Sequence, residues 1–199
     1  MKLVVGISGA TGAIYGIRVL QVLNACKVET HLVLSDSAKR TIDAETNLSV
    51  KEVEKLADYI YDNRDIGASI SSGSFKTDGM IIAPCAIKSL SALANSYNDS
   101  LLIRAADVML KEKRKLVVIP RETPLHIGHL KLMIAVAEMG AVILPPMPAF
   151  YIMPKTLDDI INQTVGKALD QFDIEHHLFR RWEGGDAGQV NRPVSIKKS

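Results

Sequence analysis

Arg121 and Glu122 are the adjacent pair of residues best placed to do chemistry in this chain. They follow the short apolar run 116–119, which reads as a buried strand. Open α/β sheets bind ligands at the carboxyl ends of their strands. An arginine there is suited to bidentate phosphate binding, beside a carboxylate that could act as acid or base. A structural ion pair is the competing interpretation.

Residues 6–12, GISGATG, lie between an expected strand and an expected helix. Glycines let a phosphate or a planar ring approach the main chain, and the N–H groups at a helix start attract anions. The segment is not the GxGxxG dinucleotide fingerprint, because Ser8 replaces the second glycine and no acidic residue closes the second strand. A tight turn alone also needs glycine. Ser35, at the end of the second strand, would add a hydroxyl to the same crevice or cap the next helix.

Residues 84–89, PCAIKS, again join a strand to a helix. Three such turns around one crevice could hold a phosphorylated flat cofactor such as FMN through main-chain donors, hydroxyl groups and Lys88. Cys85 could be a nucleophile, but nothing nearby in the sequence acts as its base. A buried cysteine that packs under the turn is therefore favoured.

Cationic and aromatic residues complete the candidates. Arg104 and Lys111 are seven residues apart and share a helix face, which fits either a ligand site or a solvated face; Lys167 is a further cation. Only 5% of residues are aromatic, so Tyr151 and the sole tryptophan, Trp182, are conspicuous. Their rings could pack on a flavin or stabilise a carbocation. For Trp182 a subunit contact is nearly as good an explanation.

These residues must be positioned by alternating strands and helices. Apolar runs predict strands at 2–7, 28–34, 59–61, 80–83, 116–119 and 141–144. Helical spacing predicts helices at 13–24, 35–45, 50–57, 87–95, 104–113, 125–139 and 157–172. The pattern predicts an α/β fold whose mainly parallel sheet is covered by helices on both faces. Residues 62–78 have no period and predict a long loop that is functional or mobile.

Composition limits the remaining possibilities. With 199 residues and 47% hydrophobic content, we expect a single domain over 1–182 and a flexible polar tail over 183–199. The net charge of +2 is spread along the chain, which argues against nucleic-acid binding. Cys26 and Cys85 have no CxxC partner, so we expect no disulfide, no metal site and a cytoplasmic location. No run approaches the roughly 18 apolar residues of a membrane span.

Five segments together resemble the UbiX-type flavin prenyltransferase family, formerly described as phenylacrylic or aromatic acid decarboxylases. They are GISGATGAIYG near the start, SGSF at 72–75, APC at 83–85, RAADVMLKEKRKLVVIPRETPL at 104–125 and PAFYIMP at 148–154. Each motif alone is weak, but their order is specific, and the match runs from about residue 2 to 182. The resemblance implies a Rossmann-like three-layer fold assembled as a homododecamer.

The resemblance also implies roles for individual residues. FMN would be held by Gly9, Ala10, Thr11, Ser35, Ala86, Ile87, Lys88, Ser89 and Arg121. The phosphate of a dimethylallyl donor would be met by Tyr151, Lys167, Lys111 and Arg121, with Arg104 nearby. Glu45 and Glu122 match carboxylates tied to proton handling. Two positions depart from the family pattern: Ile66 stands where many relatives have tryptophan, and Ala86 with Ser89 removes one hydroxyl contact.

The implied reaction joins a dimethylallyl group from dimethylallyl phosphate to N5 and C6 of reduced FMN, without a metal. The prenylated FMN would serve a UbiD-type decarboxylase. One alternative is an FMN-dependent cysteine decarboxylase of the homo-oligomeric flavoprotein group. Those enzymes need an active-site histidine early in the chain, whereas His31 lies within an expected strand. Another alternative is a non-catalytic flavin-carrier subunit.

Overall fold

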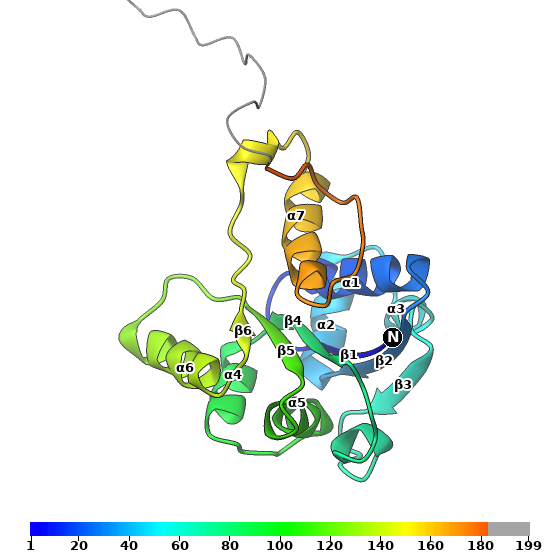
Figure 1. Cartoon of the computed structure of the whole chain (residues 1–199), viewed down its shortest axis with the longest axis vertical. Coiled ribbons are helices and arrows are strands. Elements are labelled where there is room, and N and C mark those ends of the chain that lie inside the picture. The colour runs from blue at the N-terminus through cyan, green and yellow to red at the C-terminus, as the bar shows by residue number, and fades with distance from the viewer. Residues whose placement is uncertain (183–199) are drawn as a thin grey trace, which may run out of the picture.

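The computed structural model describes residues 1–182, and these residues form one six-stranded parallel sheet with the order β3-β2-β1-β4-β5-β6 (Figure 1). The strands are β1 (Lys2–Ile7), β2 (Glu29–Leu34), β3 (Tyr59–Asp62), β4 (Gly79–Cys85), β5 (Lys115–Pro120) and β6 (Val142–Ile143). The helices are α1 (Ala13–Ala25), α2 (Asp36–Glu45), α3 (Val50–Glu54), α4 (Ile87–Ala94), α5 (Leu101–Lys111), α6 (Ile127–Glu138) and α7 (Leu157–Asp170), with 3-10 turns η1 (Ser69–Ser71) and η2 (Phe150–Ile152). The predicted α/β class and parallel sheet are confirmed.

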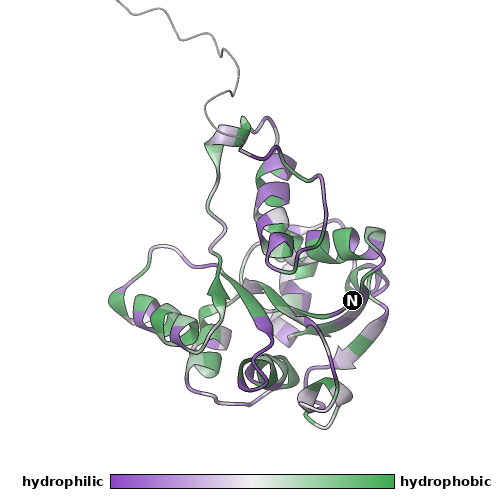
Figure 2. Ribbon diagram, viewed as in Figure 1, coloured by the Kyte–Doolittle hydropathy of each residue, from purple (hydrophilic) through white to green (hydrophobic). Residues whose placement is uncertain are grey.

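Alternation along the buried strands divides the core into two layers. In β1, Leu3, Val5 and Ile7 face α1, α2, α3 and α7, whereas Val4 faces α4, α5 and α6. Successive side chains of a strand point to opposite faces of the sheet. A strand with apolar residues on both faces can therefore be covered by helices on both sides. Figure 2 shows that much of the sheet is made of hydrophobic residues.

The three central strands end close together. β1 pairs with β2 as far as Ile7 opposite Leu34, and on its other side with β4 as far as Gly6 opposite Ile82. The chain goes to one side of β1 for β2 and β3 and to the other side for β4, β5 and β6. This reversal makes the carboxyl ends of β1 and β4 a topological switch point, where doubly wound sheets bind ligands.

Two helices, α5 and α6, begin two or three residues away from their predicted starts. α5 begins at Leu101 rather than residue 104, because it is capped by a residue 38 positions earlier: the main-chain and side-chain oxygens of Asn63 accept from Leu101 N at 2.8 Å and Leu102 N at 3.0 Å. α6 begins at Ile127 rather than 125, because His126 Nδ1 accepts from Gly128 N at 3.0 Å and caps the helix.

The segment 62–78 is anchored within the described chain. Ile70 of η1 is buried, and Arg114 donates to the carbonyl oxygens of Gly73 at 2.5 Å and Phe75 at 2.8 Å. These contacts fix the predicted loop against α5. No helix of residues 1–182 is both long and apolar enough to span a bilayer. The expected flexible tail, 183–199, lies outside the described residues.

Candidate functional site: a cleft at the switch point

A cleft opens at the carboxyl ends of β2, β1 and β4, where three strand-to-helix turns meet. It is lined by Gly9, Ser35, Ser37, Asn63, Ala86, Lys88, Ser89, Ala92, Asp99, Ser100 and Ile103. Five of the expected FMN ligands are therefore brought together: Gly9, Ser35, Ala86, Lys88 and Ser89. Ala10, Thr11 and Ile87 belong to the same turns, but their side chains do not line the cleft.

Gly9 sets the depth of the first turn. A methyl group added at this glycine would lie 2.1 Å from Cβ of Ser37, so only glycine lets the turn approach the start of α2. The turn then reaches Gly12, whose φ of 94° favours glycine. With no side chain at Gly9, the main chain of this turn itself forms a wall of the cleft, against which a flat ligand could lie.

Glu45 closes the same turn from α2. Its Oε2 accepts from Gly12 N at 2.7 Å and from Ala13 N at 3.4 Å, so the carboxylate occupies the N-terminus of α1. The sequence interpretation gave Glu45 a part in proton handling, which stays a prediction. Its contacts show a capping role that the sequence did not reveal.

Ser8 joins the first and third turns and was missed as a site residue. Its side chain is buried; Oγ donates to Pro84 O at 3.0 Å and accepts from Ala86 N at 2.7 Å. The main-chain N–H of Ser8 also donates to Pro84 O, at 3.1 Å. The serine where the dinucleotide fingerprint has glycine was the signal for this link.

Cys85 is a packing residue under the third turn, as predicted. It is fully buried, and burial raises the pKa of its thiol to about 12. A thiol with that pKa carries almost no thiolate at neutral pH and is a poor nucleophile.

Ser35 and Lys88 both line the cleft, and each also contacts a residue of its own chain. Ser35 Oγ accepts from Ala38 N at 3.1 Å, which confirms the helix-cap interpretation, and the residue still lines the cleft. Lys88 Nζ lies 3.9 Å from Asp99 across the cleft and is otherwise exposed.

Arg121 follows β5 at the same edge of the sheet. Its N–H donates to Cys85 O at 3.1 Å, which fixes the main chain beside the third turn. No ion pair to its guanidinium occurs among residues 1–182, which counts against the structural alternative. Burial raises the pKa of Tyr15, and the nearby Thr164 and Arg121 act in the opposite direction. Glu122 is exposed, and its Oε1 accepts from Thr123 N at 3.1 Å.

Arg104 lies in the first turn of α5, and Lys111 is the last residue of that helix. Arg104 Nε donates to Ser71 O at 3.1 Å, and its Nη1 pairs with Asp107 at 3.2 Å. Lys111, paired with Glu112, ends α5 two turns farther on. Since α5 starts at the cleft and runs toward the opposite edge of the sheet, Lys111 and Arg121 do not meet within one chain.

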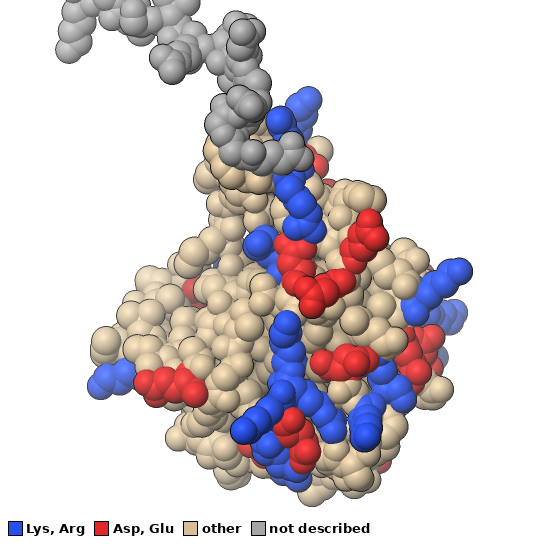
Figure 3. All heavy atoms as spheres, in the orientation of Figure 1, with Lys and Arg blue, Asp and Glu red and all other residues tan. Residues whose placement is uncertain are grey.

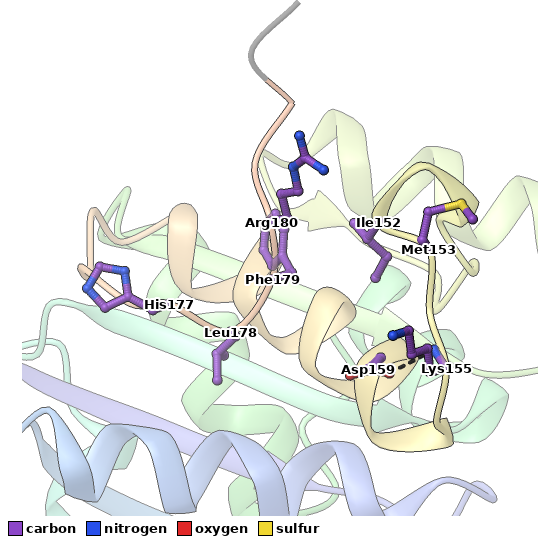
Figure 4. Close-up of a pocket in the computed structure, with 8 residues that line it drawn as sticks. All are labelled: Ile152, Met153, Lys155, Asp159, His177, Leu178, Phe179 and Arg180. Atoms are coloured by element: carbon purple, nitrogen blue, oxygen red, sulfur yellow. Dashed lines mark hydrogen bonds between the residues drawn. The ribbon is translucent and has the colours of Figure 1, made fainter. Parts of the chain in front are cut away.

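Tyr151, Lys167 and Trp182 belong to a separate region. The chain leaves β6 and runs away from the sheet to η2, then returns as α7 (Figure 1). Tyr151 meets Trp182 edge-on, with ring centroids 6.0 Å apart and an interplanar angle of 81°. Lys167 Nζ lies 3.6 Å from Asp170. Beside them is a cavity of about 480 Å³ lined by Ile152, Met153, Lys155, Asp159, His177, Leu178, Phe179 and Arg180 (Figure 4).

Comparison with known proteins identifies the architecture. The family model described as Flavoprotein matches residues 1–171. Flavin prenyltransferase UbiX of Thauera aromatica is 64% identical over 190 residues, covering 96% of this chain and 98% of that protein. Flavin prenyltransferase UbiX of Escherichia coli (strain K12) is 61% identical over 186 residues, covering 92% and 98%. The chain belongs to the flavin prenyltransferase UbiX family.

Solved structures of UbiX relatives agree with the fold. The dodecameric FMN-dependent UbiX-like decarboxylase from Escherichia coli O157:H7 superimposes with a TM-score of 0.91 at 53% identity, covering 92% of this chain and all of that chain. AnUbiX (PadA1) in complex with FMN and dimethylallyl pyrophosphate gives 0.91 at 49% identity, covering 93% and 98%. The peptidyl-cysteine decarboxylase EpiD, at 17% identity and a TM-score of 0.59, shares the fold alone.

The UbiX cleft of this chain contains residues that sequence reasoning missed. Asn63, Asp99, Ser100 and Ile103 come from loops and a helix start on the α5 side of the sheet. None of them carries a motif, since their place in the cleft depends on which strand ends lie side by side. Among residues 1–182, no cluster of three His, Cys, Asp or Glu side chains could hold a metal ion.

Proposed function

We propose that this chain transfers a dimethylallyl group from dimethylallyl phosphate to N5 and C6 of reduced FMN and releases phosphate. The prenylated FMN is the cofactor of a UbiD-type decarboxylase. The observation that carries the proposal is Arg121, an arginine without an ion pair in residues 1–182, whose main chain is bonded beside the third turn of the cleft in a UbiX-family chain.

The cleft residues fit FMN. The close approach of Gly9 to Ser37 lets a flat ring lie against the main chain of the first turn, and Ser35, Lys88 and Ser89 would add hydroxyl and ammonium donors along the same surface. Bound reduced FMN supplies the nucleophilic positions for alkylation. The protein's part is to hold the ring system and to place Arg121 where it neutralises phosphate charge.

The donor half of the site would be completed by a second copy of the chain. Lys111, at the far end of α5, cannot meet Arg121 within one chain, yet both are expected at the donor phosphate, with Arg104 nearby. A homo-oligomer is supported by exposed apolar residues on and next to α6, over which the surface is mostly uncharged (Figure 3). They are Leu125, Ile127, Leu130, Ile134 and Met139. The UbiX-like relative from Escherichia coli O157:H7 is a dodecamer.

Aromatic and acidic side chains would act on the allylic group. Tyr151 and Trp182 present ring faces that stabilise positive charge as the phosphate leaves. Glu122, exposed just after β5, would move the proton displaced from the flavin, and Glu45 would hold the first turn of the cleft. Ile66 offers no π face, so the cation would depend on the remaining aromatic rings.

The decisive experiment is anaerobic incubation with reduced FMN and dimethylallyl phosphate, followed by the mass of the extracted flavin. The expected product is FMN with an added prenyl group, and unchanged FMN would refute the proposal. Arg121→Ala should weaken FMN retention and abolish transfer, whereas Arg40→Ala, an exposed arginine on α2, should do neither.

Mixing two inactive variants tests the shared site. Arg121→Ala and Lys111→Ala are each expected to be inactive, but co-expressed chains should regain part of the activity, because some sites then receive an intact residue from each copy. Absence of any recovery in verified mixed oligomers would contradict the sharing.

The cysteine decarboxylase alternative requires an accessible histidine early in the chain, and His31 does not meet this requirement. His31 is buried in β2, stacked on Tyr59 and bonded to Tyr61 and Glu29, so it is not available to a substrate. We also infer a single FMN-binding domain over residues 1–182 and a cytoplasmic location, which two free cysteines support.

A further inference from the structure

Asp170, the last residue of α7, gathers three basic side chains. Its carboxylate accepts from Arg181 Nη2 at 2.6 Å and Nη1 at 3.1 Å, and it lies 3.1 Å from His176 Nε2 and 3.6 Å from Lys167 Nζ. Its side chain is only 17% exposed. Burial alone would raise the pKa of Asp170, but the Arg181 guanidinium, with His176 and Lys167, holds it below its ordinary value. The carboxylate is therefore charged at neutral pH.

The contacts of Asp170 fix the segment 173–182, here called the C-terminal arm, against α7. His176 Nε2 also lies 2.9 Å from Gly166 O. The Phe179 ring packs so closely on Gly166 that an added methyl group would lie 2.5 Å from its Cε1. Farther along the helix, arm residues 177–180 line the cavity of Figure 4 together with Lys155 and Asp159.

Trp182 directly follows Arg181 in the chain. Its ring meets Tyr151 edge-on, but Trp182 remains 62% exposed, so this one aromatic contact buries little of it. The bidentate pair between Arg181 and Asp170 is the nearest strong anchor, since charge-assisted bidentate pairs fix geometry as well as adding energy. Lys167 and Arg181 share a single carboxylate, which leaves net positive charge for an anion.

We propose that Asp170 is a positioning residue of the donor site: through Arg181 it holds Trp182 against Tyr151, and through its ion pair it holds Lys167. The inference rests on the proposed function, in which Tyr151, Trp182 and Lys167 face an allylic phosphate. Asp170 does not touch the donor. It places the ring that shelters the cation and the ammonium group that meets the phosphate.

Asp170→Asn tests the inference, because the amide keeps the shape and loses the charge. Trp182 is the only tryptophan of the chain, so its fluorescence reports the arm directly. Acrylamide quenching of Trp182 should rise by up to about 1.5-fold, the most that a residue already 62% exposed allows. KM for dimethylallyl phosphate should rise about fivefold, while the Kd for FMN stays unchanged. Asp173→Asn removes a charge three residues away, at a φ of 55° that asparagine tolerates, and should leave all three values unchanged.

A conservative pair of variants on the partner residue separates positioning from general destabilisation. Arg181→Gln should reproduce the effect of Asp170→Asn, whereas Arg181→Lys keeps an ion pair and should return KM to within about twofold of the original chain. If Asp170→Asn fails to fold, the comparison of Arg181→Gln with Arg181→Lys tests on its own whether the ion pair positions Trp182.

The outcomes distinguish this inference from the proposed function. Quenching needs no turnover, so a chain that makes no prenylated FMN would refute the proposed function while still showing whether Asp170 holds the arm. An active chain whose Asp170→Asn variant keeps its quenching and KM, or whose Asp173→Asn variant changes equally, would overturn the inference. Equal loss of FMN affinity in Asp170→Asn would also overturn it, because the donor half alone should respond.

Discussion

Replacing Ser8 with alanine would remove the side chain that ties two turns of the FMN cleft together. Ser8 Oγ accepts from Ala86 N at 2.7 Å and donates to Pro84 O at 3.0 Å, and the residue is 1% exposed. In Ser8→Ala the Ala86 N–H loses its partner, whereas Pro84 O keeps the main-chain N–H of Ser8 at 3.1 Å. One main-chain donor of the half-buried Ala86 therefore loses its protein partner.

The size of the effect follows from that count. A fully buried unsatisfied donor costs about 1–3 kcal/mol, so for the N–H of half-buried Ala86 we expect the lower end, and the free energy of unfolding should fall by about 1 kcal/mol. With a urea dependence of about 2 kcal/mol per molar, the unfolding midpoint should fall by about 0.5 M. Because Ala86 opens the third turn of the cleft, the same loss should weaken FMN binding by about tenfold.

Urea unfolding followed by circular dichroism, at one protein concentration, measures the first effect, and titration of FMN measures the second. Ser91→Ala is the matched control, since the Ser91 side chain makes no hydrogen bond within residues 1–182. An unchanged midpoint together with unchanged FMN affinity in Ser8→Ala would refute the account of the cleft as two turns joined by one hydroxyl.

Three further predictions concern packing, protonation and thiol reactivity. Gly16→Ala would place a methyl group 2.2 Å from a carbonyl oxygen of β4 and should lower the unfolding free energy by about 3 kcal/mol, whereas Gly67→Ala, with its nearest atom at 3.4 Å, should not. Burial lowers the pKa of His31 below 6.5 against the opposing effect of Glu29, so unfolding takes up a proton in acid; urea stability should fall from pH 7 to 5, and His31→Gln should flatten that fall. A thiol reagent should modify exposed Cys26 in the native chain and buried Cys85 only after unfolding.

Each of these has a contradicting result. An alanine at residue 16 that leaves the urea midpoint unchanged would mean that α1 can move away from the sheet at no cost. The His31 reasoning fails if the variant and the original chain show the same pH slope. Modification of both thiols in the native chain would show that the third turn opens freely.

The strands could be predicted because a strand that is buried on both faces appears in the sequence as a run of consecutive apolar residues. The run 2–7 was predicted with the limits that β1 has, since nearly every side chain in it is apolar. The start of α5 was predicted three residues late. Its first residues are all apolar, so they show no helical spacing, and the residue that caps the helix, Asn63, comes from the loop after β3. A cap supplied from a distant segment leaves no mark next to the helix.

Site residues could be predicted where they lie within one turn of the chain. They could not be predicted where two distant segments must come together. Gly9, Ser35 and Lys88 could be inferred from their own turns. The bond from Ser8 to Ala86 spans 78 residues and exists only because β1 and β4 are neighbours in the sheet. Likewise, the separation of Lys111 from Arg121 follows from the direction of α5, which residue spacing alone cannot give.

The two halves of the site are held by different forces, and they should respond differently to substitution. The FMN half consists of buried turns fixed by hydrogen bonds such as those of Ser8, so a change there should alter stability and FMN affinity together. The part of the donor half that Tyr151, Lys167 and Trp182 form depends on the C-terminal arm, which is partly exposed and is held by the ion pairs of Asp170. Exposed ion pairs contribute little to folding. A change there should therefore alter KM for the donor while the chain stays folded and FMN stays bound, and high salt should mimic that change.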